Sequence, residues 1–92
     1  MKGRLLPPKF TSPRVNIHVS GKLFEGHLSG LDQVIAWAHE CRLWPVLDLS
    51  RLDELDRAAL IYLAQGEHRD FEVMLCPPLF RDWMEHERRD AA

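Results

Sequence analysis

The chain has little of what marks disulfide-bonded, zinc-binding or phosphate-binding proteins. Only two of its 92 residues are cysteines, Cys41 and Cys76, and no Cys-x-x-Cys pair occurs. A disulfide framework or a thiolate zinc site is therefore not expected. We predict that both thiols are free, buried, small apolar side chains. Glycine-rich phosphate loops and the Gly-x-Ser-x-Gly pattern are also missing from the sequence, which leaves no motif for phosphate binding or serine hydrolase chemistry.

Long apolar runs and an excess of positive charge are missing too. Every apolar run is far shorter than the roughly 20 residues that cross a bilayer, and the first residues contain no signal-peptide core. We therefore expect a cytoplasmic protein without direct membrane insertion. The 12 basic and 14 acidic residues give a net charge of -2 and are spread along the chain. Because no basic stripe is present that would bind a phosphate backbone, nucleic acid is not an expected partner.

The five histidines do not combine into a metal-binding or catalytic set. No two of them share a helical face with a cysteine or a carboxylate at metal-ligand spacing. His39 and Cys41 would stand about 200° apart around a helix and cannot share a proton. Asp48, between two leucines, is interpreted as a structural carboxylate bonded to nearby backbone. We therefore predict a protein that is not an enzyme and needs neither a cofactor nor a metal. The histidines are His18, His27, His39, His68 and His86.

The first half of the chain predicts an arm, a strand and a helix. Residues 1–13 hold three of the six prolines and are interpreted as an arm that can include a short edge strand. Residues 14–20 alternate between apolar and polar types, which is typical of a half-buried strand, here ending at Gly21. Apolar residues then recur at threes and fours over residues 24–42, which predicts a helix. Its apolar arc is wider than one sheet needs, so Trp37 either covers the edge of the core or faces a partner.

The second half predicts two more strands and two more helices. A short, mostly apolar run at residues 46–50 predicts a strand, parallel to the first because a helix connects them. Seven consecutive apolar residues at 58–64 predict a helix that is buried on more than one side. Residues 71–76 predict a third strand, and the Pro-Pro pair after it suits the start of a last helix. Phe80 and Trp83 are predicted to be core residues of that helix.

The start of the second helix has two interpretations. Ser50 and Asp53 have the spacing of a capping box, which would begin the helix directly after Ser50. Alternatively, residues 51–55 form a loop and Asp56 is the N-cap, with its carboxylate accepting from the backbone amide of Ala58 or Ala59. We prefer the later start.

The order of elements is β-α-β-α-β-α, which is typical of an α/β protein. We predict a single α/β domain with a small, mostly parallel sheet, β-α crossovers and about three helices. It covers residues 14–88, with the arm at residues 1–13 before it and a C-terminal tail at residues 89–92 after it.

The second strand and the helix after it resemble a known family. The strand reads Val46-Leu47-Asp48-Leu49-Ser50, a connection ends in Leu55-Asp56, and the helix opens with small residues before Leu60. This order resembles the STAS domain, a family that includes anti-sigma factor antagonists and the cytoplasmic domains of sulphate transporters. Val19-Ser20-Gly21-Lys22-Leu23 resembles the family's strand that ends in Gly-x-Leu. The resemblance extends to about Arg88 and implies a single STAS-like domain.

The resemblance also locates a switch that this chain has lost. In anti-sigma factor antagonists the helix opens with Asp-Ser-Ser-Gly or a close variant, and a partner kinase phosphorylates the second hydroxyl residue. Asp56 matches the Asp, Arg57 the first Ser, Ala58 the phosphoacceptor and Ala59 the Gly. A methyl group cannot accept a phosphoryl group, so phosphorylation at Ala58 is chemically excluded.

What the resemblance implies is a docking surface at the start of this helix. The alanines would let a partner backbone approach closely, and Arg57 and Tyr62 are residue types enriched at binding hot spots. The alternative is that Ala58 and Ala59 are simply good helix formers and that Ile61 or Tyr62 lies against the sheet. The predicted partner-binding residues are Asp56, Arg57, Ala58, Ala59, Ile61 and Tyr62.

Two functions follow as expectations. The first is a non-catalytic protein-interaction module that resembles an anti-sigma factor antagonist in a bacterial signalling set, with an anti-sigma factor or kinase-like regulator as partner. The alternative is an accessory subunit of a membrane complex that transports lipids or anions, with a transporter ATPase subunit as partner. Binding of a nucleotide or another small molecule is a third, weaker class. A homodimer also stays open, because the N-terminal arm can pair within the chain or with another copy.

Overall fold

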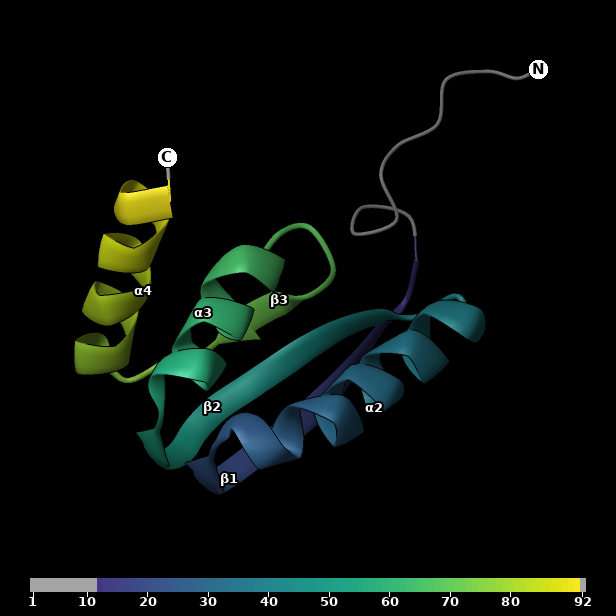
Figure 1. Ribbon diagram of the computed structural model, residues 1–92. Coiled ribbons are helices and arrows are strands. Elements are labelled where there is room, and N and C mark those ends of the chain that lie inside the picture. The colour runs from purple at the N-terminus through teal and green to yellow at the C-terminus, as the bar shows by residue number, and fades with distance from the viewer. Residues whose placement is uncertain (1–11, 92) are drawn as a thin grey trace.

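A parallel sheet forms one layer of the computed structural model, which describes residues 12–91 (Figure 1). Within these residues the sheet has three strands, β1 (Arg14–Leu23), β2 (Trp44–Leu55) and β3 (Glu72–Met74), in the order β1-β2-β3. Both strand pairs are parallel, so a helical crossover joins each strand to the next. The prediction of a small α/β domain with a parallel sheet is confirmed.

The helices gather on one face of the sheet. A 3-10 turn, η1 (Glu25–His27), leads into α2 (Leu28–Glu40), and α3 (Arg57–Gly66) and α4 (Pro78–Ala91) follow β2 and β3. Because consecutive strands are neighbours and such crossovers are right-handed, α2 and α3 lie on the same face. Figure 1 shows α4 beside α3, on the side away from α2. No helix in residues 12–91 is long and apolar enough to cross a membrane.

The core lies between this face of the sheet and the helices. Leu47 and Leu49 of β2 point toward the helices, while Asp48 between them points to the other face, as strand geometry requires. Fully buried side chains from β2, α3, α4 and the connection before β3 meet there, among them Leu47, Leu49, Leu63, Phe71 and Met84.

The three strands lie where they were predicted, but the predicted lengths of the first and third strands are wrong. In residues 15–19 the odd positions are half-buried and the even positions exposed, as predicted. The first strand does not end at Gly21 but continues to Leu23, because Lys22 and Leu23 still pair with β2 after a register shift. At this shift Gly21 adopts a φ of +73°, which glycine tolerates without a Cβ clash. The third strand spans only Glu72–Met74 instead of residues 71–76. Most of the predicted N-terminal arm, residues 1–11, lies outside the described residues.

The predicted loop over residues 51–55 is wrong, because these residues extend β2. They pair with the end of β1, with Arg51 opposite Ser20 and Leu55 opposite Leu23. The capping-box start after Ser50 is therefore excluded. The later start of the helix is confirmed, because Asp56 is the N-cap of α3.

Two burial predictions also need correction, those for Cys41 and Trp83. Cys41 is exposed, because it lies at the C-cap of α2, beyond the part of the helix that covers the sheet. Trp83 is 41% exposed, whereas Phe80 is 7% exposed. Since α4 packs beside a single helix, α3, its buried stripe is narrow and Trp83 lies at its margin. Trp37 is 50% exposed, which is compatible with both interpretations, an indole at the edge of the core and one that faces a partner. Cys76 is half-buried, and both thiols are free.

Candidate functional site

Asp56 fixes the start of α3 against the end of β1. Its Oδ1 accepts the backbone N–H of Ala59 at 2.9 Å, and its Oδ2 accepts the backbone N–H of Glu25 at 2.8 Å. These hydrogen bonds, first that from Ala59, hold the pKa of the Asp56 carboxyl below its usual value. Both oxygens of the predicted partner-binding residue Asp56 are thus engaged within the chain, and its role is structural.

The other predicted residues of α3 point in different directions. Ala59 is fully buried in the core, so its methyl group is not available to a partner. Tyr62 points toward α2, where its hydroxyl donates to Oδ1 of Asp32 at 2.9 Å. Its ring stacks on Phe71 with centroids 5.9 Å apart. Burial first, and then the hydrogen bond to Asp32, raise the pKa of Tyr62. The six predicted residues therefore do not share one surface.

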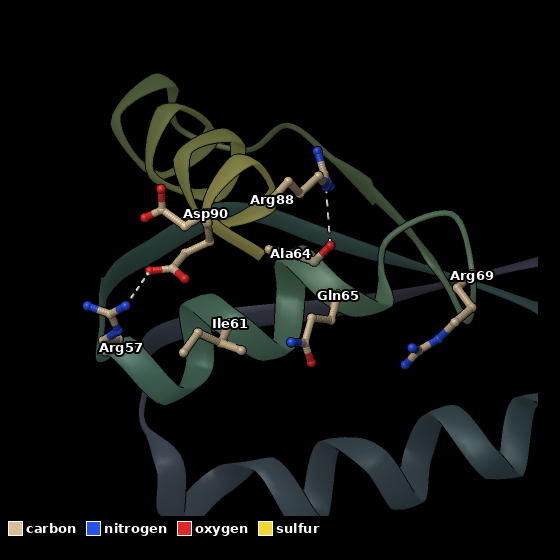
Figure 2. Close-up of a pocket in the computed structure, with 8 residues that line it drawn as sticks. Arg57, Ile61, Ala64, Gln65, Arg69, Arg88 and Asp90 are labelled. Carbon is tan, nitrogen blue, oxygen red and sulfur yellow. Dashed lines mark hydrogen bonds and ion pairs between the residues drawn. The ribbon is translucent and has the colours of Figure 1, made fainter. Parts of the chain in front are cut away.

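Arg57 and Ile61 do share a surface, which we call the α3–α4 groove. It has a volume of about 780 Å³ and lies between α3 and the carboxyl-terminal half of α4 (Figure 2). Half-buried Ile61 and buried Ala64 supply its apolar part. The Arg57 guanidinium stands at one end, with Nη2 3.2 Å from Oε1 of Glu87. Half-buried Ala58 lies in the same turn of α3 but does not line the groove.

A buried carboxylate holds the two walls of the α3–α4 groove together. Glu67, just after α3, has a side chain that is 2% exposed, and its Oε1 accepts from Nη1 of Arg81 at 2.6 Å. Arg88 donates to the same oxygen and, through Nε, to the carbonyl of Ala64 at 3.2 Å. Burial alone would raise the pKa of Glu67, but the hydrogen bonds from Arg81 and Arg88 hold it below its usual value. The guanidinium of Arg88 is therefore engaged within the chain, whereas the Arg57 side chain in the same groove is 75% exposed.

A second surface, the carboxyl-edge groove, lies on the other side of the α3 start. It has a volume of about 390 Å³ and is formed where β1 and β2 end and α4 begins. Its apolar wall consists of Phe24, Leu55, Leu79, Phe80 and Trp83. This groove was not predicted from the sequence, because Phe80 and Trp83 were both expected in the core. The apolar stripe of α4 could have predicted this groove, because it carries more large side chains than one neighbouring helix can cover.

Asp48 is bonded to its own strand and to a neighbouring histidine. Asp48 accepts the backbone N–H of Ser50 at 2.9 Å and lies 3.2 Å from Nδ1 of His18. The Ser50 hydrogen bond is the main cause that lowers the pKa of Asp48. This agrees with a structural carboxylate, as predicted for Asp48. In residues 12–91 no group of three or more His, Cys, Asp or Glu side chains could hold a metal ion.

Comparisons of the chain with protein-family models, with curated proteins and with solved structures found no match. The class of the protein therefore comes from its own fold. Residues 12–91 form a small α/β domain with three helices and a three-stranded parallel sheet, an arrangement compatible with a single STAS-like domain.

Proposed function

We propose that this chain is a non-catalytic protein-interaction module of the STAS type, resembling an anti-sigma factor antagonist, that docks a partner protein through the start of α3. The observation that carries the proposal is the α3–α4 groove, where Arg57 and Ile61 stand side by side at the helix start that the resemblance implicates (Figure 2). Asp56 serves this surface indirectly, because it fixes the first turn of α3.

The chemistry of the groove suits a protein partner. The Arg57 side chain is 75% exposed, whereas the side chain of its ion-pair partner Glu87 is 17% exposed. Because a guanidinium carries five N–H donors, Arg57 can keep its contact with Glu87 and still donate to a carboxylate of a partner. Ile61 and Ala64 offer an apolar contact next to it. An arginine beside an apolar contact is a common composition of a binding hot spot.

The position of Ala58 supports docking that is not switched by phosphorylation. Ala58 lies in the first turn of α3, where a phosphate would meet the positive end of the helix dipole. Its methyl group offers no hydroxyl to phosphorylate, so the affinity of this surface cannot be set by phosphate at this position. We expect binding to follow the concentrations of the chain and its partner.

The test is co-purification with a double variant of the groove. Tagged wild-type chain and the variant Arg57→Glu with Ile61→Asp are used to capture partners from the source cells. We expect the variant to lose its partner while circular dichroism and the Tm report a folded protein. The matched control is Arg51→Glu with Val34→Asp, which makes the same chemical changes at an exposed arginine of β2 and an exposed aliphatic residue of α2; it should retain the partner.

The outcome also separates the two expected functions. Loss of a kinase-like regulator or anti-sigma factor from the double variant supports the signalling role. Loss of an ATPase subunit supports the alternative, an accessory role in lipid or anion transport. If the double variant captures every wild-type partner in equal yield, docking through the start of α3 is wrong.

A further inference from the structure

The carboxyl-edge groove exposes large apolar side chains that nothing in the described chain covers. Leu79 is 56% exposed and Trp83 is 41% exposed, and the two stand one turn apart on the same face of α4. The ring of Trp83 rests on that of buried Phe80, with centroids 5.6 Å apart, so the indole is held in place. Contiguous exposed apolar side chains of this kind mark interaction sites.

The rim of this groove is acidic. The charged residues that line it, within the described chain, are Asp53, Glu54 and Asp56, all carboxylates. Asp56 is satisfied by two backbone amides. Glu54 lies 3.5 Å from Nζ of Lys22, and both side chains are more than half exposed. The Asp53 side chain is exposed and makes no hydrogen bond or ion pair with residues 12–91. The rim therefore presents one unpaired carboxylate and one weakly paired carboxylate next to an apolar wall.

We propose that the carboxyl-edge groove binds a basic amphipathic segment of a partner protein. Apolar side chains of the segment pack on Leu79 and Trp83, while its lysines or arginines meet Asp53 and Glu54. Laying the apolar face of a helix into such a groove is a common mode of peptide recognition. The acidic rim disfavours an anionic membrane surface or a nucleic acid, because both carry negative charge.

This proposal does not rest on the function proposed for the α3–α4 groove. The two surfaces adjoin only at the start of α3, where Asp56 lines one groove and Arg57 lines the other. Their variants do not overlap, so each can fail while the other stands.

The test measures binding of a synthetic peptide by fluorescence anisotropy. The probe is a fluorescein-labelled helix of about 14 leucines and lysines in amphipathic spacing, and the matched probe carries glutamate in place of lysine. We expect the lysine peptide to bind and the glutamate peptide not to bind. The variant Leu79→Ala with Trp83→Ala should weaken binding about tenfold or more.

A second variant tests the acidic rim separately from the apolar wall, and a control variant tests whether the effect is specific to this groove. Asp53→Lys with Glu54→Lys keeps the apolar wall and should weaken binding of the lysine peptide while permitting the glutamate peptide. Val34→Ala with Trp37→Ala removes the exposed apolar pair of α2 and should leave binding unchanged. Circular dichroism checks the fold of each variant.

Several results would overturn the proposal. One is equal binding of both peptides, and another is binding that survives both groove variants. A third is a dimer of the free chain that becomes a monomer on Leu79→Ala with Trp83→Ala, since a second copy would then occupy the groove. The fourth is sedimentation with anionic vesicles that depends on Trp83, which would assign the groove to a membrane surface.

Discussion

Gly66, at the end of α3, lies so close to the ring of Phe71 that there is no room for a side chain. A Cβ at this position would lie 2.4 Å from Cε2 of Phe71, a ring that is 1% exposed and surrounded by the core. A real methyl group cannot stay at that distance, so either the ring or the end of α3 has to move. The absence of a side chain at Gly66 is therefore a packing requirement of this fold.

We predict opposite effects for alanine at two helical glycines. Gly66→Ala should lower the free energy of unfolding by about 2 kcal/mol, because overpacking of a rigid site costs this much. Gly30→Ala, at an exposed position of α2 where an added Cβ meets nothing within 4 Å, should raise it by about 0.5–1 kcal/mol. Urea unfolding of both variants measures the difference. Equal stability of the two variants would contradict the described contact with Phe71.

Asp56 and Tyr62 show what sequence can and cannot reveal about single residues. The N-cap role of Asp56 was predicted because it depends on neighbours within the same turn. The bond from Tyr62 to Asp32 joins residues 30 positions apart, and no local pattern contains it. For the same reason, the sequence predicts Tyr62 and Arg57 on one surface, although the two side chains contact different neighbours, Asp32 and Glu87.

At the scale of elements, β2 is longer than its own sequence indicates. Exposed polar residues follow Ser50, and the spacing of Ser50 and Asp53 suits a helix start. Pairing with β1 overrides this local preference, since Arg51 to Leu55 pair with residues 20–23 at the end of β1, across a register shift between Gly21 and Lys22. Long-range hydrogen bonding of this kind depends on a second segment, which a reading of residues 46–56 alone does not include.

The contact between α2 and α3 at Tyr62 can be tested by the absorbance of the tyrosine side chain. Tyr62 is the single tyrosine of the chain, so phenolate absorbance reports its titration alone. Because its folded pKa is raised, absorbance should stay low in the folded protein at about pH 10, the usual pKa of tyrosine. Asp32→Asn should move the titration toward lower pH.

The raised pKa of Tyr62 also determines how the free energy of unfolding changes with pH. The folded state keeps the Tyr62 proton at pH values where the unfolded chain has lost it. Stability from this group is therefore complete below the unfolded pKa and declines as the pH rises above it toward the folded pKa. Titration of folded wild type at the ordinary pH of a free phenol would contradict the burial of Tyr62 between α2 and Phe71.

The ion pairs of Glu67 that join α4 to the end of α3 should affect stability in acid. Glu67 is ionised and paired with Arg81 and Arg88 in the folded state, with a pKa below the usual 4.5. Its contribution is complete above the unfolded pKa and is lost as the pH falls through the folded pKa. Glu67→Gln should lower the free energy of unfolding at neutral pH by about 2 kcal/mol and reduce its decline below about pH 4.5.

The control for this prediction is Glu85→Gln. Glu85 also pairs with Arg88, but its side chain is 47% exposed, so its loss should change stability little. Urea unfolding at a series of pH values measures both variants. The lowered pKa values of Asp48 and Asp56 leave some acid sensitivity in Glu67→Gln. An unchanged pH profile in that variant would mean that Glu67 does not hold α4 in place.

At the scale of the whole molecule, the fold class was predictable and the surfaces were not. Alternation of strand and helix periods gives the α/β order, and the crossover rule gives parallel strands. Which side chains of α4 stay exposed depends on how many elements cover it, and this is set by tertiary packing. Trp83 was therefore placed in the core, and the carboxyl-edge groove was missed.

The claim that the start of α3 is the docking surface has one most direct test. It is an NMR titration of the isotope-labelled chain with the partner that the wild type captures. We predict that the largest backbone amide shift changes fall in residues 57–61 of α3 and residues 87–90 of α4, the two walls of the α3–α4 groove. Changes confined to α2 and β1, with residues 57–61 unaffected, would contradict the account.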